Sequence, residues 1–354
     1  MKHLEWGDQQ AVPCEPKVQL VVLTYNGAAY VPDLIHSIRG QDYSRIGLTV
    51  VDNGSSDATL DVLRELLEDE DELIVNTGNL GCARGYNAGA KTAGSADVLC
   101  FLNQDIVLDS HYCSAMVDRF QEDPSVWALQ PLVRYLDRPH IVENCGHTVD
   151  EWIATSTVGH GKPLTELTVP KRIMLTLTAP AVRGHVFRQL GGFDEALFIY
   201  YEDTDFSLRI WKAGGRIAYA PRAVVDHVQA ASAAHEPDAW HAFLYARNRV
   251  RLLWKHADSP GGLGRLAAAI CGGAGIASVL LPFRPAVARS IFRGLGWNLS
   301  HWRDNEAQRR TLKLQPTRTR DLIHQGTMTP SGGPAASARK ALLGRRSWES
   351  TGAR

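Results

Sequence analysis

The sequence lacks several features that would assign it quickly to a functional class. Its 354 residues carry 38 Lys and Arg residues against 38 Asp and Glu residues, so no overall positive charge favours nucleic acid as a partner. The six cysteines form no CxxC pair and no His/Cys cluster, which argues against a zinc site or a disulfide framework and is typical of a reducing cytoplasm. The first ten residues, MKHLEWGDQQ, have no apolar stretch of the signal-peptide kind, so we expect no export.

A glycine-rich dinucleotide fingerprint is also missing. The first apolar run, at residues 18–23, leads into TYNGAAY and not into GxGxxG. Asp52, at the end of the second apolar run, could hydrogen-bond a ribose or a base, but no glycine cradle is available for a dinucleotide pyrophosphate. A nicotinamide-dependent dehydrogenase therefore ranks only third among the function classes we consider.

Short apolar runs and helical patterns alternate over the first third of the chain. The runs have strand length and are apolar on both faces, and they lie at residues 18–23, 48–51, 73–75 and 98–102. Helical stretches separate them, which predicts a doubly wound, mostly parallel α/β sheet. In such sheets the ligand binds across the carboxyl ends of the strands.

The fourth predicted strand ends in a polar tip within FLNQDIVL, residues 101–108. Asp105 in this tip lies where ligands arrive, and one carboxylate can share a Mg²⁺ ion with a substrate phosphate. The alternative is that Asp105 only caps the following turn.

Between the third and fourth strands lies NTGNLGCARGYNAGAKTA, residues 76–93. Gly78, Gly81 and Gly85 would allow the backbone to come close to a ligand. Arg84 stands among these glycines at the predicted start of a helix. Its charge, the backbone N–H groups and the helix dipole together suit a diphosphate.

A second acidic cluster stands in LFIYYEDTDFSLRIWKAG, residues 197–214, where Glu202, Asp203 and Asp205 crowd the first turn of a predicted helix. Capping would stabilise the helix by about 0.3–1 kcal/mol for each carboxylate. Three carboxylates exceed what capping needs, so we expect a base for a hydroxyl nucleophile.

His227 ends a predicted strand, AVVDHV, as Asp105 ends its own. Imidazole is a frequent ligand for ions of the Mn²⁺ class, so His227 is a candidate metal ligand. Asp226 beside it could orient the ring, although strand alternation should point Asp226 to the opposite face.

These segments form an ordered set: TYNG at a strand end, VVDNGSSD, GNLGCARGYNAG, NQD, GGFDE followed by EDTDFSLR, and then DH. The set closely resembles the inverting family 2 glycosyltransferases of GT-A fold, and more narrowly the bacterial branch that includes rhamnosyltransferases. The resemblance covers roughly residues 17–256.

The resemblance implies a role for each matching residue. It implies that Asp52 bonds the nucleobase, that Arg84 lies near the diphosphate, and that Asp105 and His227 hold a divalent Mg²⁺ or Mn²⁺ ion. Asp203 would be the general base, with Glu202 beside it. The full set of residues implied to bind the nucleotide sugar is Thr24, Tyr25, Asn26, Asp52, Asn79, Gly81, Arg84, Asn87, Asn103, Gln104 and Asp105.

One position departs from the family pattern, because Asn103 stands where a strict DxD motif has aspartate. The change removes one negative charge from the expected metal site. A catalytically silent nucleotide-sugar-binding or scaffold protein on the same fold is therefore the alternative.

The implied function is transfer of a sugar from a nucleoside-diphosphate sugar to a hydroxyl of a glycan or polyprenyl-linked glycan in cell-surface polysaccharide synthesis. A deoxythymidine diphosphate-rhamnose donor is the expectation at family level. The expected location is the inner face of the cytoplasmic membrane.

The chain divides into four expected parts: a flexible lead-in at residues 1–16, a glycosyltransferase domain at 17–258, an apolar and basic helical extension at 259–308, and a basic, largely disordered tail at 309–354. Residues 266–283 are uncharged but weakly apolar for a membrane span. An interfacial helix fits better, because Arg265, Arg284, Arg289 and Arg293 flank it. A buried hairpin or a homodimer contact are the alternatives.

Overall fold

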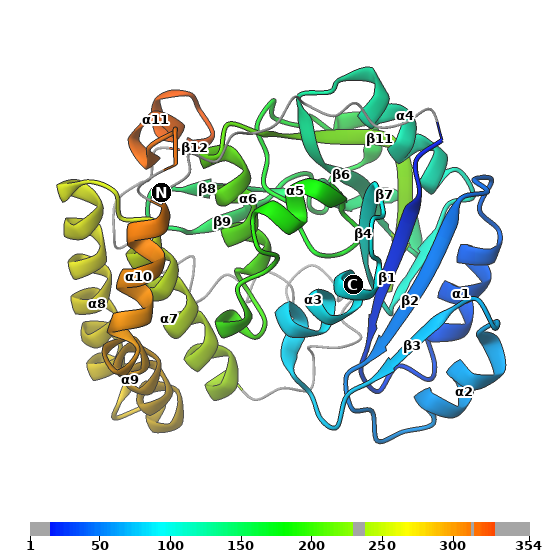
Figure 1. Ribbon diagram of the computed structural model, residues 1–354. Coiled ribbons are helices and arrows are strands. Elements are labelled where there is room, and N and C mark those ends of the chain that lie inside the picture. Colours follow the sequence, from blue (N-terminus) through cyan, green and yellow to red (C-terminus); the bar gives the residue numbers. More distant parts are fainter. Residues whose placement is uncertain (1–14, 229–237, 313–314, 330–354) are drawn as a thin grey trace.

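The computed structural model describes residues 15–228, 238–312 and 315–329 (Figure 1). Its centre is a mixed sheet. In spatial order the strands are β3 (Glu72–Val75), β2 (Ile46–Asp52), β1 (Val18–Thr24), β4 (Val98–Asn103), β10 (Ala181–Arg183), β6 (Val126–Tyr135), β11 (Arg216–His227) and β5 (Ile106–Leu108), with β7 (Arg138–Asn144) paired to β6. The predicted α/β sheet is confirmed, and its first four strands are all parallel.

Helices cover both faces of the sheet. One face carries α1 (Val31–Arg39), α2 (Thr59–Leu66) and α4 (Tyr112–Glu122), and the other carries α3 (Gly81–Thr92), α5 (Gly184–Gln189) and α6 (Glu202–Lys212). Strand β1 shows why both faces are apolar: Leu20 and Val22 enter one core, and Val21 enters the other. This alternation follows from the two-residue period of a strand, so a strand buried on both sides reads as a continuous apolar run.

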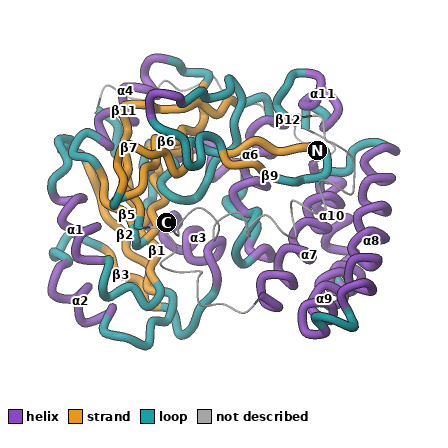
Figure 2. The backbone as a smooth tube through the Cα atoms, turned by 180° about the vertical axis from the view of Figure 1, so that it is seen from behind, coloured by secondary structure: helices purple, strands orange, loops and turns teal. Residues whose placement is uncertain are grey.

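A helical layer lies at one side of the sheet, and Figures 1 and 2 show it from opposite directions. It consists of α7 (Asp238–Lys255), α8 (Pro260–Leu280), α9 (Pro285–Ser300) and α10 (Trp302–Leu312). The helical extension expected after residue 258 is therefore present. Helix α7 packs against α8, α9 and α10, and its Asn248 and Lys255 bond Leu197 and Asp205 outside the layer.

Part of the expected disordered tail is folded. Residues 319–329 form α11 (Thr319–His324) and β12 (Met328–Thr329), and β12 adds to a small sheet with β8 (His147–Asp150) and β9 (Thr155–Thr157). The reason is burial, because Leu322 and Met328 are fully enclosed and their apolar side chains offset the low hydrophobicity around them. Residues 330–354 and most of the lead-in lie outside the described residues.

Candidate functional site

The first four strands end at the same edge of the sheet. The parallel register aligns Thr24 of β1 with Asp52 of β2, Asp52 with Val75 of β3, and Leu23 of β1 with Asn103 of β4. The polar residues that follow these strands are thereby brought together, as the sequence predicted. We call the segments at residues 24–28, 52–57 and 76–81 the strand-end loops.

Hydrogen bonds between side chain and backbone hold the first two strand-end loops. Asp52 is fully buried, and its Oδ2 accepts from the N–H groups of Gly54 and Ser55 at 3.1 and 3.0 Å. Asn26 has a φ of 50° and its Oδ1 accepts from the N–H of Ser56 at 2.8 Å. Both predicted nucleotide ligands thus shape the loops, and base binding by Asp52 stays a prediction.

Asn53 holds the third strand-end loop, although the sequence analysis did not single it out. Its Oδ1 accepts from the side chain of Asn76 and from the N–H of Leu80, both at 3.1 Å. Its Nδ2 donates to Oδ1 of Asn79 at 3.0 Å and to the carbonyl of Gly81 at 3.3 Å. Asn53 is buried, and both its amide oxygen and its amide nitrogen have hydrogen-bond partners. An amide can accept and donate at once, which an ionised carboxylate cannot, so an asparagine suits the position between Asp52 and Gly54.

Gln104 joins the β4 tip to the end of β1. Its Oε1 accepts from the Thr24 hydroxyl at 2.7 Å and from the Tyr25 N–H at 2.8 Å, while its Nε2 donates to the Tyr25 carbonyl at 3.2 Å. Gln104 is buried, whereas the Tyr25 ring is 42% exposed. Gln104 therefore positions the loop, and Tyr25 is the member of this group whose ring faces solvent.

Two of the three glycines that were expected to approach a ligand, Gly81 and Gly85, lie close to protein atoms instead. Gly81 begins α3 with a φ of +82°, and a Cβ there would lie 2.5 Å from the ring of Phe198. A Cβ at Gly85 would lie 2.3 Å from Leu23, whereas Gly78 faces open space. The glycine at the start of α3 thus lets the segment before the second acidic cluster lie against the strand-end loops.

Two further predicted ligands on α3 contact the GGFDE turn. Asn87 is buried and exchanges hydrogen bonds of 2.9 Å with the backbone N–H and carbonyl of Phe193. Arg84 is about half exposed and lies 3.4 Å from a carboxylate oxygen of Glu195. Asn87 is therefore a structural clamp, while Arg84 keeps its guanidinium at the surface.

Asp105 and His227 come together as predicted. Strand β5 runs antiparallel to β11, and His227 Nε2 lies 3.2 Å from Asp105 Oδ1. The other ring nitrogen, Nδ1, lies 2.6 Å from a carboxylate oxygen of Glu143. Burial disfavours the imidazolium, but hydrogen bonds with Asp105 and Glu143 outweigh it and raise the pKa of His227 to about 10.

Glu143, and not Asp226, orients this histidine. Asp226 points away and forms a two-point ion pair with Arg134, with N–O distances of 2.9 and 2.8 Å. The strand alternation predicted this separation of Asp226 from His227. Glu143 was missed because it lies on β7, 84 residues away along the chain.

The geometry fits a divalent ion only if a ligand from outside the chain completes the coordination. In many metal sites a carboxylate bonds one ring nitrogen of a histidine and the other ring nitrogen binds the metal. Glu143, at Nδ1 of His227, matches the carboxylate, and Nε2 faces Asp105. Among the described residues, however, no group of three or more His, Cys, Asp or Glu side chains could hold a metal. Asn103 adds no charge, and its Oδ1 accepts from the Tyr86 hydroxyl at 2.8 Å.

The second acidic cluster contains two carboxyl groups in different environments. Glu202 is buried, and its Oε2 has no hydrogen-bond partner in the part of the chain that the structure describes. Burial and the charge of Asp203 raise the pKa of Glu202 well above its usual range. Two adjacent carboxyl groups with such different surroundings can divide the roles of acid and base, and Glu202 is the member that holds its proton more tightly than usual.

Asp203 is partly exposed and is oriented by a chain of hydrogen bonds. The hydroxyl of Thr204 donates to Asp203 Oδ1 at 3.1 Å, and His147 Nε2 lies 3.0 Å from that hydroxyl. Burial lowers the pKa of His147, against the opposite effect of Asp203. The neutral imidazole can therefore donate to Thr204, which donates in turn to Asp203.

The backbone before this cluster is strained. Phe198, Tyr200 and Tyr201 have φ angles of 65°, 72° and 72°, which is unfavourable for residues with large side chains. Such residues cost about 1–3 kcal/mol each and persist only where the surroundings hold them.

Asn248 on α7 supplies that hold. It is fully buried, and its Nδ2 lies 2.9, 2.9 and 2.8 Å from the carbonyl oxygens of Leu197, Ile199 and Tyr200. Sequence reasoning missed it, because an asparagine within a helix ARNRVR carries no sign of a contact made about 50 residues earlier in the chain.

Asp105 and the second acidic cluster both act electrostatically on Cys82, the second residue of α3. Burial raises the pKa of the Cys82 thiol, and the negative charges of Glu202, Asp203 and Asp105 raise it further. The same applies to buried Tyr86, whose hydroxyl pKa is raised by burial and then by Cys82, Asp105 and Glu202. The charges of Asp105 and of the second acidic cluster thus both reach the first turns of α3, and we call this region the candidate cleft.

Asp205, the third acid of the predicted cluster, belongs to a buried ion-pair network and not to the cleft. It bonds Arg209, Lys255 and His256 at 2.8, 2.9 and 3.0 Å. Burial acts to raise the pKa of Asp205, yet the charges of Lys255 and Arg209 hold it well below its usual range. Lys255 also reaches Asp194 of the GGFDE turn at 2.9 Å, so the network fastens α6 and this turn to α7.

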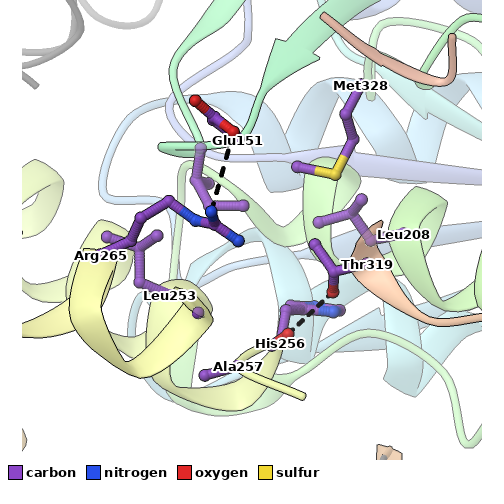
Figure 3. Close-up of a pocket in the computed structure, with 10 residues that line it drawn as sticks. Glu151, Leu208, Leu253, His256, Ala257, Arg265, Thr319 and Met328 are labelled. Carbon is purple, nitrogen blue, oxygen red and sulfur yellow. Dashed lines mark hydrogen bonds and ion pairs between the residues drawn. The ribbon is translucent and has the colours of Figure 1, made fainter. Parts of the chain in front are cut away.

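A separate small cavity lies between α6, α7, α8 and the 319–329 segment (Figure 3). Its wall includes the Glu151–Arg265 pair, with an N–O distance of 3.7 Å, and the Thr319 hydroxyl, which donates to the His256 carbonyl. Its volume of about 10 Å³ is enough for about one water molecule. None of the cleft carboxylates lines it, so it is not the candidate site.

Two family models match the chain. Glycosyl transferase family 2 matches residues 19–154, and glycosyl transferase family group 2 matches residues 98–249. Together they span the sheet, both acidic clusters and most of α7.

Named relatives and a solved structure agree with these matches. The O-antigen chain rhamnosyltransferase RfbN of Salmonella typhimurium is 27% identical over 232 residues, which are 60% of this chain and 66% of the relative. The N-acetylglucosaminyl-diphospho-decaprenol L-rhamnosyltransferase of Mycobacterium tuberculosis is 25% identical over 264 residues, 67% of this chain and 84% of the relative. The chain therefore spans about two thirds of the Salmonella protein and more of the mycobacterial one.

The crystal structure of GalNAc-T7 with UDP, GalNAc and Mn²⁺ has a TM-score of 0.55 and 16% identity, and the match covers 71% of this chain and 51% of that one. This likeness concerns the fold, which is of GT-A type.

Proposed function

Since the chain belongs to glycosyl transferase family 2, we propose that it transfers a sugar from a nucleoside diphosphate to a hydroxyl of a glycan or polyprenyl-linked glycan, with inversion at the anomeric carbon. A rhamnosyl donor and cell-surface polysaccharide synthesis are the specific form of this proposal, because two relatives bear rhamnosyltransferase names. The reaction would take place at the cytoplasmic side of the membrane. The observation that carries the proposal is that His227 Nε2 lies 3.2 Å from Asp105 Oδ1, just beyond the edge where the parallel strands end.

In the proposed reaction Asp203 takes the proton of the acceptor hydroxyl. The oxygen attacks the anomeric carbon from the face opposite the diphosphate, the carbon–oxygen bond to the diphosphate breaks, and the nucleoside diphosphate leaves with the electron pair. The hydrogen bond from the Thr204 hydroxyl orients this carboxylate toward its proposed task.

The strand-end loops and the β4 tip would bind the donor. In this proposal Asp52 bonds the base, Tyr25 lies beside it with its exposed ring, and Arg84 approaches the diphosphate from the first turn of α3. Asp105 and His227 would hold a Mg²⁺ or Mn²⁺ ion together with the diphosphate. When bound, such an ion neutralises the charge that develops on the leaving group.

The test separates donor binding from transfer. Nucleoside diphosphates and nucleotide sugars, with and without Mn²⁺, should raise the melting temperature of the protein, and the donor should be consumed when an acceptor is present. Asp203→Asn should lower kcat about 10³-fold while the donor-induced thermal shift persists. Glu202→Gln, which matches the neutral form of Glu202, is the control and should retain most of the activity.

Two outcomes would contradict the assignment. Loss of donor binding in Asp203→Asn would make Asp203 structural. A donor-induced thermal shift without any donor turnover would favour the alternative, a catalytically silent nucleotide-sugar-binding protein. The argument for that alternative is Asn103, which replaces the aspartate of a strict DxD motif.

A further inference from the structure

The outermost helix of the molecule is apolar and largely uncovered. Helix α8 forms the edge of the helical layer in both views (Figures 1 and 2). Among the described residues it is the one helix long and apolar enough to cross a membrane, and only 11% of its most apolar stretch is buried. The reading of this segment as a buried hairpin is therefore wrong.

The exposed apolar side chains gather where α8 ends and α9 begins. Val279, Leu281 and Phe283 are 69%, 45% and 80% exposed. Single exposed apolar residues are ordinary on a protein surface, whereas several at the tip of one hairpin mark a contact surface. We call residues 279–283 the hairpin tip.

Positive charge surrounds the hairpin tip. Residues 259–303 contain five arginines and no Asp or Glu. Arg289 and Arg293 are exposed on α9, and Arg284 directly follows the tip. Guanidinium groups next to an exposed apolar edge suit a surface that is anionic outside and apolar beneath, as a bilayer of anionic lipids is.

A spanning helix does not fit the packing. Leu266 and Ala277 of α8 are buried, and a Cβ at Gly273 would lie 3.4 Å from Leu295 of α9. Arg265 in the second turn of α8 pairs with Glu151. One face of α8 is therefore fixed to the rest of the protein, and only the opposite face and the tip are available to lipid.

We propose that the hairpin tip and the outer face of α8 insert into the headgroup region of an anionic lipid bilayer, with the arginines of α9 against the phosphates. The binding is peripheral and reversible, since the buried apolar area is small and the electrostatic part is screened by salt.

Helix α7 connects this surface to the segment before the second acidic cluster. Arg284 forms an ion pair with Asp238, which begins α7. In the first turns of α7, Tyr245 stacks on Tyr200 with ring centroids 4.8 Å apart, and Tyr200 stands two residues before Glu202. Resting on the proposed function, the inference is that a membrane-held acceptor reaches Asp203 past this aromatic group.

The experiment is co-sedimentation of the full chain with vesicles of phosphatidylcholine alone or with phosphatidylglycerol. We expect at least about tenfold more binding to the anionic vesicles, with loss in high salt. Val279→Ser/Leu281→Ser/Phe283→Ser should abolish binding, and Arg289→Gln/Arg293→Gln should remove most of the preference for anionic lipid. Leu136→Ser and Arg64→Gln, which change exposed residues outside the helical layer, are the matched controls.

The inference is overturned if the wild-type chain does not sediment with vesicles or if the triple-serine variant sediments equally. A third outcome also overturns it: the wild-type chain is a dimer that does not bind vesicles, and the triple-serine variant is a monomer by size-exclusion chromatography. The hairpin tip would then be a contact between two copies of the chain. Donor turnover with a short soluble acceptor, measured on the same variants, should stay unchanged. Absence of that turnover in the wild type would refute the proposed function and leave vesicle binding intact.

Discussion

Two buried asparagines hold the two sides of the cleft, and they do so over very different distances along the chain. Asn53 fixes the strand-end loop at residues 76–81, and its hydrogen-bond partners there lie 23 to 28 residues from it along the chain. Asn248 on α7 fixes the segment before Glu202, and its hydrogen-bond partners in that segment lie 48 to 51 residues from it along the chain. One side is therefore built from neighbouring strand ends, and the other depends on α7.

The two sides also differ in strain and charge. The strand-end loops rely on neutral polar groups and on Asp52, whose oxygens accept from nearby N–H groups and the Ser55 hydroxyl. The segment before Glu202 holds three large residues at positive φ and is fastened by buried ion pairs. The difference teaches that donor contacts can be set locally, whereas the proposed base is positioned by long-range contacts.

The largest expected difference concerns stability. Asp205→Asn should lower the free energy of unfolding by about 3–5 kcal/mol, because buried Arg209 would lose its carboxylate and Lys255 would keep only Asp194. Asp57→Ala, at the exposed end of a strand-end loop, should cost about 1 kcal/mol as a lost loop cap. Urea unfolding measures both, and equal losses would contradict the contrast between the two sides.

The asparagine pair should separate kcat from KM. Asn248→Ala should lower kcat about 10- to 100-fold, since a shift of the segment before Glu202 misplaces Asp203, while the donor-induced thermal shift remains. Asn53→Ala should mainly raise the KM for the donor. Steady-state kinetics on both variants decide the matter, and a change in KM alone for Asn248→Ala would remove its positioning role.

A smaller effect is expected at the proposed metal site. Glu143→Gln should weaken Mn²⁺ binding in the presence of a nucleoside diphosphate about tenfold, because His227 loses the carboxylate that fixes its ring. Asp226→Asn is the matched control, since Asp226 pairs with Arg134 and should leave Mn²⁺ affinity unchanged. Titration followed by electron paramagnetic resonance reads out free Mn²⁺ without any need for turnover.

The smallest effect is the pH dependence of stability. Burial is the chief cause that lowers the pKa of His256 to about 4, below the ordinary value of about 6.5 that applies in the unfolded chain. The unfolded chain therefore binds this proton more readily, so the contribution of His256 to stability should be constant above about pH 6.5 and fall as the pH decreases toward 4. The lowered pKa of Asp205 extends the loss into stronger acid.

His256→Gln tests this assignment. Melting temperatures measured between pH 7 and 4 should show a shallower decline for the variant than for the wild type, whatever its stability at pH 7. An unchanged slope would mean that another group titrates.

The sequence predicted the sheet well because its signal is local. Apolar runs such as residues 18–23 are strands buried on both faces, and their polar ends meet because parallel strands end at one edge. The pairing of Asp105 with His227 was also predicted, through the likeness of NQD and DH to a known family. The tail was misjudged, since Leu322 and Met328 are too few to show in composition yet are fully buried.

The roles of individual polar residues could not be predicted in the same way. Gln104 and Asn87 were expected to contact the nucleotide sugar, and both are occupied in holding the backbone. Asp205 was grouped with Asp203 because they stand on one helical turn, although their side chains face a cleft and a buried ion network respectively. A sequence records which groups can hydrogen-bond but not which partner reaches them first.

The chain by itself determined the order of strands and helices, the polar edge of the sheet and the family, because all of these follow from local hydrophobic periodicity and short motifs. Tertiary structure alone decided that Glu143 orients His227, that Asn248 holds the strained segment, and that the apolar face of α8 stays uncovered. Each of these depends on which distant surfaces pack together, and that choice is made by the burial of the whole core rather than by any one segment.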